Sequence, residues 1–282
     1  MTVAGLFLSH VESSRIDRHF ERLAGESGGA IAWRRVLNPG GHATPRMESI
    51  ACPAPEAVLP LRVEAMRRNN GVSGGFFDTV IWSCLAALDA DFTWVLEYDV
   101  DFSGDWSRLF AQFTESPADL LTTTLLARPE SPDWFWWRTA QAPAGIADAG
   151  MYRSVLPVMR ISRRMAATYA QAMREPGWAG HYEFTLPTAA MAAGMSVEDI
   201  GGAGPLCPPE RAGRNYSNTP QHAPLTPGTF VWRPSWERYF HEAPDSFPEP
   251  DMLYHPVKPD VAEWDRERFA AAGQSEPQAE QT

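Results

Sequence analysis

The chain has 282 residues, of which 44% are hydrophobic. This is enough to bury a large core, so we expect one folded domain over residues 1–258 and a polar tail over residues 259–282. The chain carries 35 acidic and 24 basic residues, and its formal net charge is −11. A surface of this sign repels phosphate backbones and anionic lipids, which argues against a nucleic-acid partner.

The cysteines are three in number, far apart in the sequence, and form no CxxC pair: Cys52, Cys84 and Cys207. This spacing disfavours a disulfide framework and a zinc knuckle, and it indicates a reducing compartment. The apolar start of the chain lacks a basic region, which is typical of a first core strand and not of a signal peptide. No apolar run reaches the ~18–20 residues of a membrane span. We therefore expect a cytoplasmic protein with no transmembrane segment.

Short apolar runs alternate with amphipathic stretches along the chain. They predict strands at 3–9, 30–37, 92–96, 119–126, 154–161 and 196–200. They predict helices at 14–24, 75–88, 105–113, 162–173 and 182–193, with serine N-caps at Ser13 or Ser14 and at Ser162. Residues 38–60 predict a long loop or lid, and residues 127–150 and 201–250 are irregular. This order predicts an α/β fold with a mostly parallel central sheet flanked by helices, whose ligands bind beyond the carboxyl ends of the strands.

Three acidic residues follow the apolar strand 92–96 at alternate positions, in the sequence Glu97-Tyr98-Asp99-Val100-Asp101. In an extended chain such side chains project to one side. Burying three like charges beside an apolar core is costly unless a cation neutralises them. Carboxylates suit Mg²⁺ or Mn²⁺, whose remaining ligands can be phosphate oxygens. The alternative is a solvated exit from the strand, since Asp-x-Asp also occurs in ordinary turns.

Residues 92–102, Phe-Thr-Trp-Val-Leu-Glu-Tyr-Asp-Val-Asp-Phe, resemble the DxD strand of family-2-like glycosyltransferases of the GT-A type. An amphipathic helix precedes this strand, as in that family. The resemblance implies a metal-dependent enzyme that moves a sugar from a nucleotide-sugar donor to a hydroxyl-bearing acceptor (a glycan, a lipid or a small molecule), with inversion. It implies that Asp99 faces the nucleotide or the metal, and that Asp101 is the main protein ligand of Mn²⁺ or Mg²⁺.

The resemblance also implies a general base at the start of a later helix, and Glu183 has that placement. A helix N-terminus favours an ionised carboxylate, so we expect the pKa of Glu183 to be low. The family often shows two adjacent acids here, whereas this chain has Tyr182 before Glu183. The alternative is that Glu183 only complements the helix dipole.

A late segment, Tyr254-His255-Pro256-Val257-Lys258, resembles the histidine segment that closes over the metal in many GT-A enzymes. This implies that His255 is a metal ligand and that Lys258 adds positive charge to the diphosphate. His10, at the end of the first strand, lies where GT-A folds meet the nucleotide base. The alternative is that His255 is structural and that His10 is a polar strand exit.

Residues 134–138, Trp-Phe-Trp-Trp-Arg, form an aromatic cluster that either plugs the core of its loop or lines an acceptor cleft. Two other functions remain open: a sugar nucleotidyltransferase and a non-catalytic binding protein on the same fold. The first lacks a Gly-rich, basic segment after strand 3–9. The absence of a GxSxG motif disfavours a serine hydrolase, and a glycoside hydrolase would use paired carboxylates without a metal.

Overall fold

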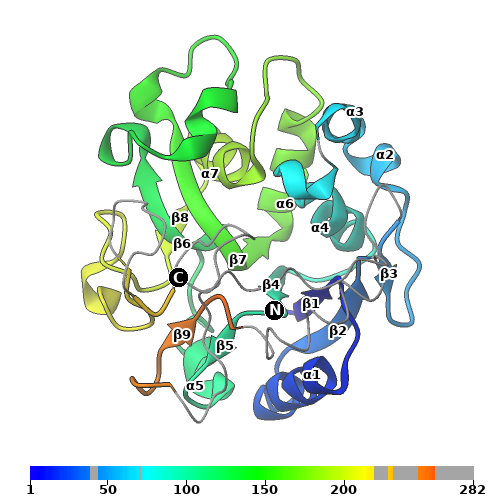
Figure 1. The fold of residues 1–282 in the computed structure, drawn as a ribbon, viewed down its shortest axis with the longest axis vertical. Helices are drawn as coiled ribbons and strands as arrows, with labels where there is room; N and C mark the ends of the chain where they lie inside the picture. Colours follow the sequence, from blue (N-terminus) through cyan, green and yellow to red (C-terminus); the bar gives the residue numbers. More distant parts are fainter. Residues whose placement is uncertain (39–43, 70, 219–227, 231–246, 258–282) are drawn as a thin grey trace, which may run out of the picture.

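The protein has an α/β fold with a central seven-stranded sheet flanked by helices (Figure 1). The structure is a computed structural model that describes residues 1–38, 44–69, 71–218, 228–230 and 247–257. The central strands are β1 (Val3–Ser9), β2 (Ala32–Leu37), β3 (Arg46–Met47), β4 (Phe92–Glu97), β6 (Leu120–Ala127), β7 (Tyr152–Ser162) and β8 (Val197–Asp199). A second sheet pairs β5 (Asp101–Phe102) with β9 (Leu253–Tyr254).

The central sheet has the strand order β3-β2-β1-β4-β7-β6-β8 and is mixed. Strands β1, β2 and β4 are parallel to one another, and β8 is parallel to β6. Strand β7 runs antiparallel between β4 and β6, and β3 runs antiparallel to β2. Strands β1, β2, β4, β6 and β8 therefore run in the same direction, as expected of a mostly parallel sheet. Their carboxyl ends meet the amino end of β7 at one edge of the sheet.

Both faces of the sheet are covered, which explains why the central strands β1 and β4 are almost continuously apolar. Phe7, Trp94 and Leu96 pack with α1 (Ser14–Glu26) and α5 (Trp106–Ala111) on one face. The alternate residues Leu8 and Val95 pack on the other face. The helices there are α4 (Asp78–Leu85), α6 (Arg163–Ala172) and α7 (Tyr182–Ala192) (Figure 1).

The expected serine caps are confirmed at two helices. Ser13 accepts a hydrogen bond from the backbone N–H of Ile16 at the start of α1. Ser162 accepts one from Met165 at the start of α6. Each cap satisfies a backbone donor that the first turn leaves unpaired, and it thereby fixes where the helix begins.

Two expectations for the first half of the chain are wrong. Residues 38–60 are not a plain loop, because they contain β3 and α2 (Pro55–Val58), and α3 (Pro60–Arg68) begins at their end. Proline at the first helical position suits a helix start, and both short helices use it. The helix expected at 75–88 begins only at Asp78, since Gly75 has φ +95° and interrupts it. The short 3₁₀ helices are η1 (Val72–Gly74), η2 (Arg128–Glu130), η3 (Phe135–Thr139), η4 (Asp148–Gly150) and η5 (Pro209–Arg211).

Residues 201–218 are irregular but firmly attached to the sheet by Asp199 at the end of β8. Its carboxylate accepts hydrogen bonds from the backbone N–H groups of Gly201 and Gly202 at 2.9 and 2.8 Å. The Tyr216 hydroxyl donates to the same carboxylate. A buried carboxylate with this many donors is satisfied within the protein, so Asp199 holds the loop in place.

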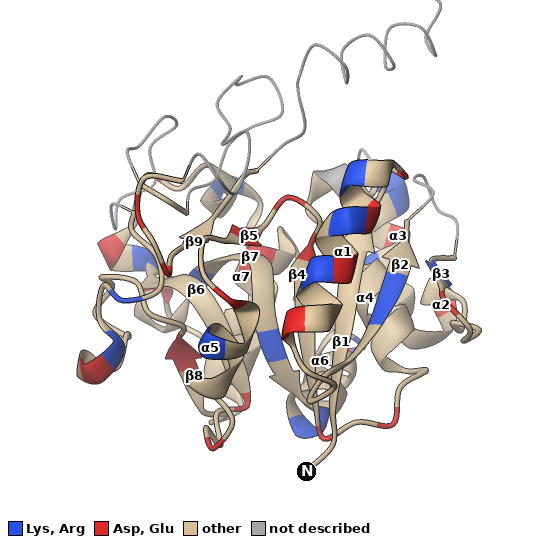
Figure 2. Cartoon of the chain, turned by 90° about the horizontal axis from the view of Figure 1, so that it is seen from below, with Lys and Arg blue, Asp and Glu red and all other residues tan. Residues whose placement is uncertain are grey.

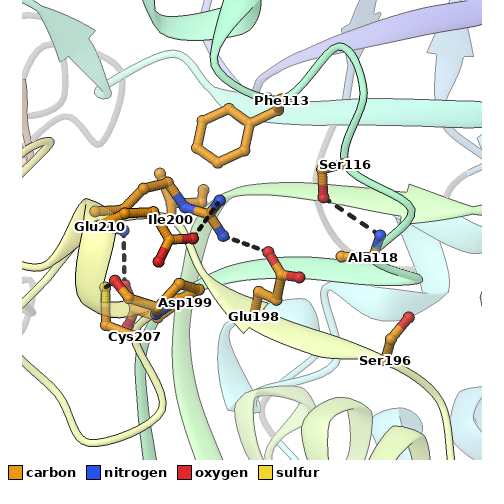
Figure 3. Close-up of polar contacts among 12 residues, drawn as sticks. Phe113, Ser116, Ala118, Ser196, Glu198, Asp199, Ile200, Cys207 and Glu210 are labelled. Carbon is orange, nitrogen blue, oxygen red and sulfur yellow. Dashed lines mark hydrogen bonds and ion pairs between the residues drawn. The ribbon is translucent and has the colours of Figure 1, made fainter.

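A second anchor of this loop is the guanidinium of Arg211. It pairs with Glu198 of β8 and lies 5.2 Å from the centre of the Phe113 ring. Figure 3 shows Phe113, Glu198 and Glu210 gathered around this contact. The loop 201–218 is thus fixed against β8, the last strand in the order of the central sheet.

The surface charges are interspersed along α1, where basic and acidic residues alternate (Figure 2). Arg22 forms an i, i+4 pair with Glu26 on this helix. Within the described part of the chain, no helix has both the length and the apolar character to cross a bilayer. The expected tail 259–282 lies outside the described residues.

Candidate functional site

The candidate site lies at the edge where the carboxyl ends of β1 and β4 meet the start of α7. The chain leaves β4 through a tight turn in which the backbone N–H of Tyr98 donates to Leu8 of β1 and that of Val100 donates to Glu97. These bonds hold the turn against the neighbouring strand. The acidic residues after β4 therefore have fixed directions.

Asp99, in this turn, lies beside His255 of the C-terminal segment. His255 Nε2 is 3.9 Å from Asp99 Oδ2, and both residues are buried. The backbone explains the meeting: β9 pairs with β5, Val257 N–H donates to the Asp99 carbonyl at 2.7 Å, and His255 N–H donates to the Thr229 carbonyl. The C-terminal segment is thereby held across the end of β4.

Asp101 is directed elsewhere. Its carboxylate accepts a hydrogen bond from Arg22 Nη1 at 2.7 Å and lies 3.9 Å from His19 Nδ1, both on α1. Arg22 also donates to the carbonyls of Phe102 and Gly104. A guanidinium already neutralises Asp101, and the structure does not bring it into the Asp99–His255 pair. Its arrangement is that of a residue that holds the turn.

Asp99 and His255 together offer ligands that fit a divalent cation whose remaining ligands are phosphate oxygens. A hard carboxylate oxygen and a neutral imidazole both suit Mn²⁺. Among the described residues, no three His, Cys, Asp or Glu side chains group closely enough to hold a metal alone. Oxygens from a ligand or water would have to complete the coordination.

Glu97 connects this turn to α7. The Tyr182 hydroxyl lies 3.5 Å from Glu97 Oε1, at the outer limit of a hydrogen bond. Burial, and next the negative charge of Glu97, raise the pKa of Tyr182 well above its ordinary value. The phenol therefore stays protonated and can donate. Glu183 is the next residue of α7.

Glu183 is buried, at 5% exposure, and its pKa differs from the expected one. Burial raises the pKa of Glu183 to about 8, and the nearby charge of Arg153 opposes this only in part. The expectation of a low pKa was wrong because it weighed the helix N-terminus and not the loss of solvent. A carboxylate that titrates near neutral pH matches what a general base requires.

His181 caps α7 and contacts Glu183. Its Nδ1 accepts a hydrogen bond from the Glu183 backbone N–H at 3.2 Å and lies 3.5 Å from Glu183 Oε2. Burial, and next the charge of Arg62, lower the pKa of His181 to about 3. The imidazole is neutral and its Nδ1 is an acceptor, so this contact is not an ion pair. It leaves Glu183 without a neutralising neighbour on its own helix.

The start of α7 rests on a buried ion pair that sequence reasoning missed. Arg62 donates from Nε to Asp78 at 2.7 Å and from Nη1 to the Gly180 carbonyl at 2.8 Å. Tyr182 N–H donates to the Gly75 carbonyl, to which Arg62 also donates. Nothing in the local pattern marks Arg62 or Asp78, because their partners are distant in the chain. The pair fixes the turn that presents Glu183.

The aromatic cluster divides into two parts. Trp134 and Trp137 are buried and pack with Phe184 of α7, as expected of a core plug. Phe135 is 45% exposed, with the Arg138 guanidinium carbon 3.4 Å from its ring centre. Trp136 is half-buried, and its ring centre lies 4.8 Å from that of His181. An aromatic surface therefore adjoins the residue that caps the Glu183 helix.

Of the remaining candidates, His10 is placed and Lys258 is not. The His10 ring packs edge-on against Tyr98, with ring centres 5.1 Å apart. His10 therefore contacts the turn that follows β4. Lys258 lies outside the described residues.

No protein-family model matches this chain, and no curated protein matches it.

Proposed function

We propose that the protein is a metal-dependent glycosyltransferase of the GT-A type that moves a sugar from a nucleotide diphosphate to a hydroxyl acceptor. The observation that carries the proposal is the contact of Asp99 with His255 at the end of β4. It joins a carboxylate and an imidazole at the edge where α/β folds bind ligands. An anionic donor can approach such a negatively charged edge only together with a cation.

The donor would occupy the turn after β4. Asp99 and His255 would hold the cation, which would neutralise the diphosphate as it leaves. Asp101 would not be a ligand in this proposal. It would instead keep the turn in place through Arg22. His10 and Tyr98 would present an aromatic edge to the nucleoside.

The acceptor would bind between the start of α7 and the rings of the exposed Phe135 and the half-buried Trp136. Sugar C–H faces pack on aromatic rings, and Arg138 adds hydrogen-bond donors at the same surface. Glu183 would remove the proton of the acceptor hydroxyl as its oxygen forms a bond with the anomeric carbon. The bond from that carbon to the diphosphate breaks in the same step, so a single displacement would invert the configuration.

Calorimetry with UDP- and GDP-sugars, with and without Mn²⁺, tests the proposal. We expect binding that requires Mn²⁺ and weakens about 100-fold in Asp99→Asn and in His255→Gln. Asp91→Asn is the matched control, because Asp91 precedes the opposite end of the same strand and accepts from Thr2. The two test variants and the control must all unfold at the same temperature as the wild type.

Other outcomes would assign a different function. Binding of a nucleoside triphosphate with release of pyrophosphate would indicate the sugar nucleotidyltransferase. Absence of any nucleotide binding by the folded protein would contradict the transferase and leave the non-catalytic binding protein.

A further inference from the structure

Cys52 and Cys84 are in contact, although 32 positions separate them. Their Sγ atoms lie 3.7 Å apart, and both are free thiols. Cys84 is fully buried in α4, whereas Cys52 is half-buried in the segment between β3 and α2. The sequence spacing disfavoured a disulfide framework, but the fold brings these two residues together.

We propose that Cys52 and Cys84 form an oxidisable dithiol that closes to an intramolecular disulfide when the protein meets hydrogen peroxide. The bond requires the sulfurs to approach by about 1.7 Å, because a disulfide measures about 2.05 Å. The half-buried position of Cys52 admits a small oxidant. The buried Cys84 then acts as the resolving thiol.

The surroundings assign the two roles. The two thiols are in hydrogen-bond contact through their sulfur atoms. This hydrogen bond, opposed by partial burial and supported by a backbone hydrogen bond from Met47, lowers the pKa of Cys52 to about 7. The same contact, together with burial, raises the pKa of Cys84 well above its ordinary value. Cys52 is therefore the nucleophile, because it is the more exposed of the two thiols and the thiolate is the reactive form.

The reaction balances in two steps. The Cys52 thiolate attacks one oxygen of the peroxide, which breaks the O–O bond, forms a sulfenic acid and releases hydroxide. The Cys84 sulfur then attacks the Cys52 sulfur, loses its proton and expels the hydroxyl as water. In total, two thiols lose two electrons and two protons, and the peroxide is reduced to two molecules of water.

The backbone near the pair favours formation of the disulfide from the Cys52 sulfenic acid. Ser83, next to Cys84, donates its hydroxyl to the Pro53 carbonyl, next to Cys52. The two chain segments are thus already joined one residue away from the sulfurs. Both cysteines also pack in the core cluster that lines this face of the sheet. The new bond would tie the segment before α2 to α4.

Cys207 provides an internal control. It is buried, and burial, together with the nearby charge of Asp199, raises the pKa of its thiol to about 11. Its sulfur contacts the Pro208 carbonyl. A thiol of this kind reacts slowly with peroxide.

The experiment treats the reduced full-length protein with hydrogen peroxide, unfolds it in guanidinium chloride with iodoacetamide, and maps the peptides by mass spectrometry. We expect a mass loss of two hydrogen atoms, one alkylated thiol at Cys207, and linked peptides that contain Cys52 and Cys84. Dithiothreitol should restore three alkylated thiols. Cys207→Ser should link as the wild type does, and Cys52→Ser should form no link.

Two results would overturn the inference. The first is a wild-type protein that keeps three alkylated thiols after treatment. The second is oxidation of Cys52 directly to the sulfinic acid while Cys84 remains a thiol. Neither result depends on nucleotide binding, so the inference stands or fails separately from the proposed function.

Discussion

The Tyr182 hydroxyl lies 3.5 Å from Glu97 Oε1, which joins the first residue of α7 to the last residue of β4. The contact matters because each residue has a neighbour with a proposed role. Asp99 follows Glu97 in the turn, and Glu183 follows Tyr182 on the helix. One phenol–carboxylate contact therefore relates the position of the proposed base to that of the proposed metal ligand.

The raised pKa of Glu183 predicts the pH dependence of turnover. A general base must be ionised, so we expect release of nucleoside diphosphate from the donor to rise with pH and to level off above about pH 8. Glu183→Gln should lower the rate at least about 100-fold while donor binding is preserved. The measurement is a pH–rate profile at saturating donor. A wild-type rate that does not change between about pH 6 and about pH 9 would contradict the assignment.

The same carboxyl group predicts a pH dependence of stability. The folded-state pKa of about 8 exceeds the unfolded value of about 4.3, so the folded protein binds the extra proton between these limits. Its contribution to the free energy of unfolding is fully present below about pH 4.3 and is lost as the pH rises through about 8. The loss is on the order of 5 kcal/mol. Urea unfolding should show that Glu183→Gln removes this decline, and an equal decline in the variant would refute the prediction.

Arg22 and Asp101 form a pair whose role we expect to be structural. Asp101→Asn keeps the shape of the side chain but removes the charge that neutralises Arg22. We expect it to lower the free energy of unfolding by about 1–3 kcal/mol, since Arg22 is partly solvated, and to leave Mn²⁺-dependent donor binding within about threefold. Urea unfolding and calorimetry measure the two effects. If donor binding were lost at unchanged stability, Asp101 would be a metal ligand after all.

Gly75 is predicted to be essential for the position of His181. It has φ +95°, and a Cβ atom there would lie 2.2 Å from His181 Cδ2. We expect Gly75→Ala to shift the start of α7 and to lower turnover at least about tenfold, with a loss of stability of about 1–3 kcal/mol. Gly145→Ala is the control, because Gly145 has φ +106° and no atom near the added Cβ. Equal turnover in both variants would show that His181 is not displaced.

The rings of Phe135 and Trp136, which are not fully buried, predict a selective effect on the acceptor. We expect Phe135→Ala and Trp136→Ala to raise the KM for the acceptor by about tenfold or more while donor affinity stays constant. Trp137→Ala should instead destabilise the fold by about 3–5 kcal/mol, because Trp137 is buried. Steady-state kinetics with transfer to a panel of glycans and glycosides separates these effects. An unchanged acceptor KM in both Phe135→Ala and Trp136→Ala would show that these rings do not bind the acceptor.

Much of the fold follows from local patterns in the sequence. The apolar run of β1 has the expected bounds, and the caps at Ser13 and Ser162 are the expected ones. These features depend on a few neighbouring residues. The direction of β7 was not predictable in the same way, because it is set by pairing with β4 and β6 and not by its own composition.

The candidate site was predictable in residue type but not in arrangement. The acidic turn after β4 and the late histidine are visible in the sequence, and the structure places Asp99 beside His255. The diversion of Asp101 to Arg22 depends on a partner 79 positions away. The pKa of Glu183 depends on its burial, which no local pattern reports. Contacts of this kind appear only once the chain is folded.

The pairing of β5 with β9 has a consequence for biosynthesis. Asp99 is translated early, but its partner His255 directly follows β9 and is among the last of the described residues to be made. All strands of the central sheet precede residue 200, so the sheet can assemble before the segment with His255 is made. The proposed cation site would be completed only once the segment with His255 has been made, so a polypeptide that stops before His255 would have its central sheet but would be unable to engage its donor.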